Sequence, residues 1–228
     1  MQPTDIDVIR DQVRNFYATG NKSGNKVYAK SKSEVLTQDA FERKQQGFFN
    51  RLFASRKFAQ RNKNVALSQK FRPTSWGNAP YEFGQQIWNS SIAAEFRSGN
   101  CGEMACVSSY LAVAQYMASR AKVYLGCVTP PGDHAFCLLA LSNPPAWRRV
   151  RDMSGAGESG SYVIDPWLNI ACEAGFYGML AAEKLEKWHR DGKRVSWGGP
   201  NDNAPGWYDP VGTYADAFRD SPLQFVAV

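Results

Sequence analysis

The sequence predicts an α+β fold, in which helices pack on a small antiparallel sheet. The chain has 228 residues, of which 43% are apolar, and this is enough to bury a sizeable core. Residues 122–129 form an apolar run with β-branched side chains, and residues 134–141 form a second apolar run after a Pro-Pro-Gly turn, a pattern typical of a hairpin. Helical patterns precede and follow these strands. A third strand is expected at 162–167. The order helix, strand, strand, strand, helix favours the α+β class.

The chain begins with a helical pattern. Four apolar residues recur at 3-4-3 spacing: Ile6, Ile9, Val13 and Phe16. This spacing predicts an amphipathic helix that ends near Gly20. Residues 20–33 are small, polar and basic, which indicates a loop. A second amphipathic helix is expected at about 38–60.

Charge divides the chain into two parts. Residues 1–72 carry 15 Lys or Arg and 6 Asp or Glu, whereas the remainder carries 12 and 15, and the net charge is +6. We therefore expect a basic helical N-terminal region over 1–75, with a targeting or packing role, and a second domain over 76–228. Basic and aromatic residues alternate in 48–63. The favoured interpretation packs this segment on the body; an anionic membrane surface or an acidic partner is the alternative, and nucleic acid is unlikely.

The remaining elements are predicted from periodicity and from turn residues. They are helices at 82–97, 101–120 and 173–191, the last stopped by Gly192; a strand at 162–167 ended by Pro166; an exposed insertion at 142–161; and an irregular loop at 196–212.

Several classes of protein are excluded or disfavoured. No apolar run approaches the length of a membrane span, and the first residues do not resemble a cleaved secretory signal. Five cysteines without a CxxC pair argue against a disulfide scaffold and favour a reducing compartment. The cysteine and histidine spacings do not fit a zinc site, and no phosphate-binding glycine loop occurs. We expect neither a metal nor a cofactor.

The sequence Asn100-Cys101-Gly102-Glu103 begins a predicted helix. Asn is a preferred N-cap, and Glu three residues later completes a variant of the capping box. Cys101 then lies in the first turn, where unpaired N–H groups and the helix dipole favour an anion. A cysteine there is a candidate nucleophile, and the same N–H groups are candidate oxyanion donors. The structural alternative is a small core cysteine near a cap.

Two further residues complete a candidate triad. His134 begins a strand after a tight turn, and Asp165 ends a nearby strand at Asp-Pro. If these strands pair antiparallel, both side chains lie at one edge of the sheet. The carboxylate then fixes the imidazole tautomer and leaves the other ring nitrogen facing the thiol. The only other histidine, His189, is expected on a solvated helix face.

These motifs resemble the papain/transglutaminase-like superfamily. The likeness covers about residues 81–170, carried by Gly99–Ala105 at a helix start, Gly132–Phe136 at a strand start and Val163–Trp167 at a strand end. Within the superfamily, the chain is most similar to bacterial papain-fold toxin and effector domains, such as YopT-type peptidases and OspI-type glutamine deamidases.

The resemblance implies roles for individual residues. Cys101 would be the nucleophile, His134 the general base and acid, and Asp165 the orienting carboxylate, with the nucleophile-bearing helix packed on the sheet. Asp133 and Asp152 are the alternative carboxylates, because the interval between His134 and Asp165 is long. The resemblance also implies an oxyanion donor upstream of the cysteine, for which Asn100 and Gln86 are the candidates.

The function implied is cysteine-dependent hydrolysis or acyl transfer on amide bonds. Glutamine deamidation or transamidation of a target protein ranks above proteolysis and peptidoglycan amidase activity. The non-enzymatic alternative is a catalytically inactive papain-like binding module with a basic helix. A bacterial effector or toxin would leave the bacterial cytoplasm without a cleaved signal and act in the reducing cytosol of a target cell. Its expected partners are a protein substrate and a cognate immunity or chaperone protein.

Overall fold

The computed structural model describes residues 3–17, 23, 26–28, 80–91, 93–94, 97, 99–116, 121–141, 146–154, 160–197 and 206–228. Helix α1 (Pro3–Phe16) is followed by strand β1 (Lys26–Tyr28) and by helices α4 (Pro80–Trp88) and α5 (Cys101–Tyr116). The helix expected at 38–60 and the segment 48–63 lie outside the described residues.

The central feature is a five-stranded antiparallel sheet with the strand order β5-β4-β3-β2-β8. Its strands are β2 (Lys122–Val128), β3 (His134–Ala140), β4 (Ser161–Asp165), β5 (Ile170–Glu173) and β8 (Leu223–Ala227). The β2–β3 hairpin pairs Val128 with His134 and Lys122 with Ala140, which confirms the predicted hairpin. The α+β class is therefore present, and the central sheet has two more strands than the three expected.

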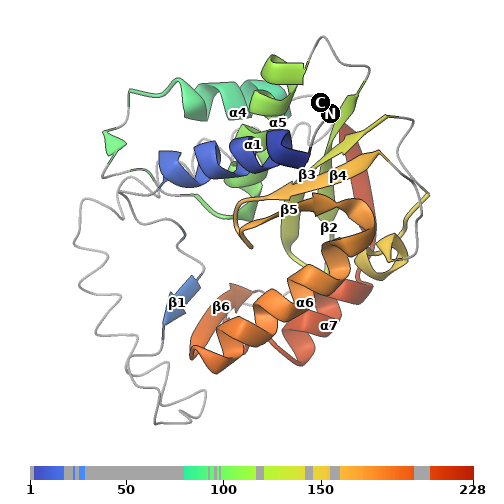
Figure 1. Ribbon diagram of the computed structural model, residues 1–228. Coiled ribbons are helices and arrows are strands. Elements are labelled where there is room, and N and C mark those ends of the chain that lie inside the picture. Colours follow the sequence, from blue (N-terminus) through green and yellow to red (C-terminus); the bar gives the residue numbers. More distant parts are fainter. Residues whose placement is uncertain are drawn as a thin grey trace.

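Helices cover both faces of this sheet (Figure 1). Successive residues of β3 point to opposite faces. The ring of Phe136 packs against Tyr177 of helix α6 (Ala174–Arg190), with centroids 4.8 Å apart. The next residue, Cys137, makes a hydrogen bond with Ser109 of α5 on the other face. All residues of β3 are buried, as expected for a central strand covered on both sides.

Helix α1 belongs to the core of this body. Its four periodic apolar residues are buried and join the central hydrophobic cluster: Ile6, Ile9, Val13 and Phe16. The helix contacts α5, β4 and β5. Strand β1 pairs with β6 (Lys193–Trp197), which also pairs with β7 (Gly206–Tyr208). The described parts of residues 1–75 thus pack on the rest of the molecule.

Helix α5 approaches α4 closely at one glycine. A Cβ atom on Gly84 would lie 2.1 Å from the carbonyl oxygen of Cys106. Only glycine allows the two helix backbones to come so near. The α4 helix ends at Trp88, so the helix expected over 82–97 is shorter than predicted. The hydroxyl of Ser90 donates to the carbonyl of Ile87 at 2.7 Å, a local bond that competes with helix continuation.

The insertion expected to be exposed at 142–161 is partly buried. Its described centre holds a short 3₁₀ helix, η2 (Val150–Met153), in which Val150 and Met153 are fully buried. Residues three apart share one face of a 3₁₀ helix, so these two point inward while the arginines point outward. The expectation was wrong because the three arginines and the glycines obscured this spacing.

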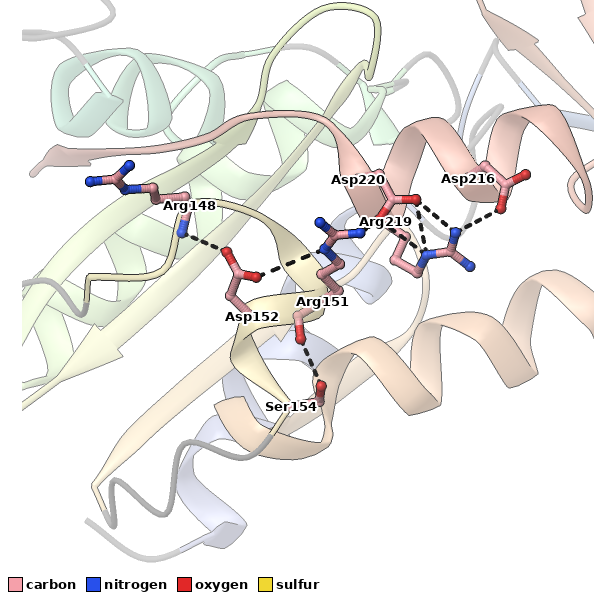
Figure 2. Close-up of polar contacts among 7 residues, drawn as sticks. All are labelled: Arg148, Arg151, Asp152, Ser154, Asp216, Arg219 and Asp220. Carbon is pink, nitrogen blue, oxygen red and sulfur yellow. Dashed lines mark hydrogen bonds and ion pairs between the residues drawn. The ribbon is translucent and has the colours of Figure 1, made fainter.

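Ion pairs on the surface connect η2 to helix α7 (Thr213–Asp220) (Figure 2). Arg151 Nη1 lies 3.0 Å from Asp220 Oδ1, and Arg219 binds both Asp220 and Asp216. Asp152 accepts a hydrogen bond from the backbone N–H of Arg148. The loop expected at 196–212 also proved partly regular, since Ser196 and Trp197 end β6 and β7 follows at 206–208.

Candidate active site

The first turn of α5 has the cap that the sequence predicts. The backbone N–H of Asn100 donates to Glu103 Oε2 at 2.9 Å, and the N–H of Met104 donates to the carbonyl of Asn100 at 3.1 Å. Glu103 is buried and reaches back to the residue before the helix, as in a capping box. Cys101 is buried in this turn, where backbone N–H groups lack intrahelical acceptors.

His134, which begins β3, and Asp165, which ends β4, meet at the same end of these two strands, as predicted. In the pairing of β3 with β4, Leu138 lies opposite Val163, so His134 and Asp165 fall on the same face. His134 Nε2 lies 2.8 Å from Asp165 Oδ2. Both side chains are almost fully buried, at 1% and 0% exposure. Their contact is therefore shielded from water.

The carboxylate of Asp165 is held from three directions. The hydroxyl of Tyr177 donates to Oδ2 at 2.9 Å, the same oxygen that contacts His134. The backbone N–H of Leu168 donates to Oδ1 at 3.0 Å. This second bond is made possible by the turn that follows Pro166. Sequence reasoning did not identify Tyr177, because its spacing marks it only as a core residue of α6.

The imidazole of His134 is stabilised in its protonated form. Burial alone lowers the pKa of His134, but the charge and hydrogen bond of Asp165 outweigh it, and Cys101 adds in the same direction. Together these groups raise the pKa of His134 from 6.5 to about 10. An opposite charge in contact favours the charged form of a titratable group.

The second ring nitrogen of His134 is the one available to Cys101. Nδ1 is buried and makes no hydrogen bond of regular geometry within the described residues. Cys101 nevertheless lies close enough to act on the imidazole both as a hydrogen-bond partner and as a charge. Because Asp165 occupies Nε2, Nδ1 is the nitrogen left for Cys101. The three predicted residues are thus brought together, in the order thiol, imidazole, carboxylate.

Aromatic side chains surround the imidazole. The rings of Trp167 and Phe218 each have their centroids 5.2 Å from that of His134. Tyr214 is also buried beside the site: burial raises its pKa well above the usual value, and Cys101 is the strongest of the nearby charges that add to this. Phe218 and Tyr214 come from α7, about 80 residues after His134 in the chain. No sequence pattern linked them to the site.

The other candidates are placed elsewhere. Gln86 is exposed on α4, whereas the residues of α4 that face α5 are buried. Asn100 adjoins Cys101, and its side-chain Oδ1 accepts a hydrogen bond from Ser23 at 3.2 Å. Asp133 is exposed, whereas His134, the next residue, is buried. Asp152 takes part in the surface network of η2.

Among the residues that the structure describes, the remaining titratable groups form no second triad of thiol, imidazole and carboxylate. His189 is exposed on α6, as expected, and its Nδ1 lies 2.7 Å from Asp209 Oδ1. None of the five cysteines, all of which lie in the described part of the chain, forms a disulfide. Within the described ranges, no group of three or more His, Cys, Asp or Glu side chains could hold a metal ion. No helix in the described part of the chain is both long and apolar enough to cross a membrane.

Comparisons with protein-family models, with curated proteins and with solved structures found no match to this chain.

Proposed function

We propose that the protein is a cysteine-dependent amide hydrolase or acyl-transferase, with Cys101 as nucleophile, His134 as general base and acid, and Asp165 as orienting carboxylate. One observation carries this proposal: a buried His134–Asp165 hydrogen bond of 2.8 Å leaves the other imidazole nitrogen to a cysteine in the first turn of a helix. Nucleophilic catalysis of this kind requires a nucleophile, a base and a group that orients the base.

The first half of the reaction forms a thioester. The sulfur of Cys101 attacks the amide carbonyl carbon, and the C–N bond breaks as the imidazolium of His134 gives its Nδ1 proton to the departing amine or ammonia. An imidazolium beside a cysteine favours the thiolate, which is the reactive form. Asp165 keeps the ring oriented and stabilises its positive charge throughout.

The second half releases the acyl group. His134, now neutral, takes a proton from water, and the hydroxide attacks the thioester carbon. The C–S bond breaks, the product leaves as a carboxylic acid, and the thiolate–imidazolium pair is restored. An amine in place of water yields a new amide, which is transamidation. Backbone N–H groups in the first turn of α5 are the donors for the oxyanion.

The finer assignments rest on the resemblance of the motifs to the papain/transglutaminase-like superfamily. A helix that carries the cysteine and packs on an antiparallel sheet, with histidine and aspartate on neighbouring strands, supports the papain-like assignment. On this basis we assign the protein to bacterial effectors or toxins that deamidate or transamidate glutamine on a target protein, with proteolysis as the alternative.

The nucleophile can be tested without a known substrate. A fluorescent iodoacetamide, added near neutral pH, is expected to label Cys101 before Cys137 and Cys172, because burial raises the pKa of each of the latter two thiols to about 12. Peptide mapping should show this label lost in Cys101→Ala and retained in Cys106→Ala, a matched change of a buried cysteine on the same helix. Equal labelling of the thiols in the folded wild type would contradict the proposal.

The reaction type requires candidate substrates and intact-mass analysis. Glutamine deamidation replaces an amide by an acid and leaves the chain whole, whereas proteolysis produces fragments. Wild type and Cys101→Ala are compared on the same target-cell lysate fractions. A reactive Cys101 with no change in any target would favour the binding-module alternative.

A further inference from the structure

Two residues that follow the end of α1, Tyr17 and Ser23, contact the loop before the nucleophile. A Cβ atom on Gly99 would lie only 3.0 Å from the ring of Tyr17, so Tyr17 packs directly on this backbone. The hydroxyl of Ser23 donates to Asn100 Oδ1 at 3.2 Å. Gly99 and Asn100 immediately precede Cys101. The contacts therefore act on the segment that leads into the first turn of α5.

The same part of the chain contacts the loop after the catalytic carboxylate. Arg14 Nη1 donates to the carbonyl of Pro166 at 3.0 Å. The indole N–H of Trp167 donates to Ser23 Oγ at 3.1 Å. Pro166 and Trp167 immediately follow Asp165. Ser23 thus accepts from one catalytic loop and donates to the other through a single hydroxyl.

We propose that Arg14, Tyr17 and Ser23 form an N-terminal clamp that holds the nucleophile loop against the carboxylate loop, and that Ser23 is a positioning residue for the triad. The inference rests on the proposed function, because it assigns the clamp to the same site. It gives the start of the N-terminal region a role distinct from targeting.

The clamp is anchored on both sides of Ser23. On the N-terminal side, α1 is fixed in the core by the fully buried side chains of Ile9 and Val13. On the other, β1 is hydrogen-bonded to β6 over Lys26–Tyr28. Figure 1 shows α1 beside α5 on one side and the sheet on the other. A hydroxyl held from both directions can fix the spacing of two loops that are distant in sequence.

The two loops bear on the reacting groups in different ways. Trp167 packs on the imidazole of His134, so its indole orientation limits movement of the ring and entry of water. Asn100 is covalently joined to Cys101, and its N–H is held by Glu103. Loss of the Ser23 hydroxyl would remove the hydrogen bonds that join the two loops, so the spacing between the thiol and the imidazole would be less closely fixed. Small misplacements of this kind reduce rates without removing any catalytic group.

The test measures alkylation of Cys101 by iodoacetamide as a function of pH, using the full chain. Ser23→Ala is expected to slow alkylation at neutral pH roughly two- to tenfold, the loss that corresponds to one hydrogen bond of ordinary net strength. Its pH–rate profile is expected to move to higher pH, because a displaced imidazolium favours the thiolate less. Ser23→Thr keeps the hydroxyl and should restore the wild-type profile.

Ser108→Ala is the matched control. It removes another buried serine hydroxyl, which donates to the carbonyl of Met104 within α5 and joins no two loops. This variant should keep the wild-type pH–rate profile even if its melting temperature falls. A wild-type profile for Ser23→Ala, or an equal shift for Ser108→Ala, would overturn the inference.

A second variant covers the case in which Ser23→Ala does not fold. Arg14→Met removes the donor to Pro166 but keeps an apolar stem, and it should move the profile in the same direction. A folded Arg14→Met protein with an unchanged profile would then reject the clamp. Failure of the proposed function has a different signature, since wild-type Cys101 would then show no preferential alkylation in the first place.

Discussion

Each of the two histidines in this chain pairs with an aspartate, and the two pairs differ in almost everything except distance. His134 Nε2 lies 2.8 Å from Asp165, with side chains 1% and 0% exposed. His189 Nδ1 lies 2.7 Å from Asp209, with side chains 47% and 34% exposed. Asp209 also binds Arg194 at 2.6 Å, so the second pair belongs to a surface network.

The two pairs have nearly the same His–Asp distance. Burial of the side chains and the presence of Cys101 as a third group therefore distinguish the candidate catalytic pair from the surface ion pair. Water screens exposed pairs, which contribute little energy and little orientation. In the buried pair, Tyr177 and Leu168 fix the carboxylate. Asp165 occupies Nε2, and Cys101 lies close enough to raise the pKa of the imidazole. In the surface pair, Asp209 instead binds the guanidinium of Arg194.

The test with the largest expected effect replaces one histidine at a time with alanine. His134→Ala should reduce turnover of a model amide below detection, because the imidazole serves as both base and acid and each role contributes roughly 10²- to 10⁴-fold. His189→Ala should leave turnover nearly intact. Measuring both variants at a temperature where both are folded separates chemistry from stability. The opposite result, with His189 essential and His134 dispensable, would reject the site.

The second test neutralises the two carboxylates. Asp165→Asn should lower kcat by roughly 10²-fold or more, because the imidazole loses the group that holds its tautomer and charge. It should also lower the free energy of unfolding by about 1–3 kcal/mol, since the amide presents a donor where Asp165 accepts three hydrogen bonds.

Asp209→Asn is the control for that test, because it makes the same chemical change in the exposed pair. Its turnover should remain close to wild type. Asp133→Asn is a second control, since Asp133 is exposed and the carboxylate bound to His134 is that of Asp165. Normal kcat for Asp165→Asn together with an inactive Asp133→Asn would move the orienting role to Asp133.

The third test uses the pH dependence of stability. The folded-state pKa of His134, about 10, lies above the ordinary histidine value of 6.5. The protonated pair therefore stabilises the fold fully below pH 6.5, and this contribution is lost as the pH rises through about 10. Urea unfolding should show wild type losing stability over this range relative to His134→Gln. A constant difference between the two proteins from pH 6 to pH 10 would contradict this pairing.

The smallest effect is expected in the surface network of Figure 2. Asp152, an alternative carboxylate by sequence, has a side chain that is 40% exposed and lies 3.9 Å from Arg151 Nε. Asp152→Asn should change the free energy of unfolding by less than about 1 kcal/mol and leave kcat unchanged. Thermal melting and model-amide turnover measure the two quantities. A large loss of turnover would mean that η2 contributes to the site.

Local sequence patterns determined much of the site. The Asn100–Glu103 capping box, the hairpin that begins β3 at His134 and the Asp-Pro end of β4 depend on interactions between residues a few positions apart. Such patterns are visible in the chain itself. Helix α6 and its stop at Gly192, where φ is 68°, were predictable for the same reason.

Only the tertiary structure decided what surrounds the triad. Tyr177 on Asp165, Phe218 beside His134 and Ser23 between two loops come from elements far apart in sequence. The sequence also suggested that Asp165 ends a strand at a turn, without showing that the carboxylate is completely buried. Contacts between distant segments depend on how helices pack on a sheet, and periodicity within one element carries no information about its neighbour.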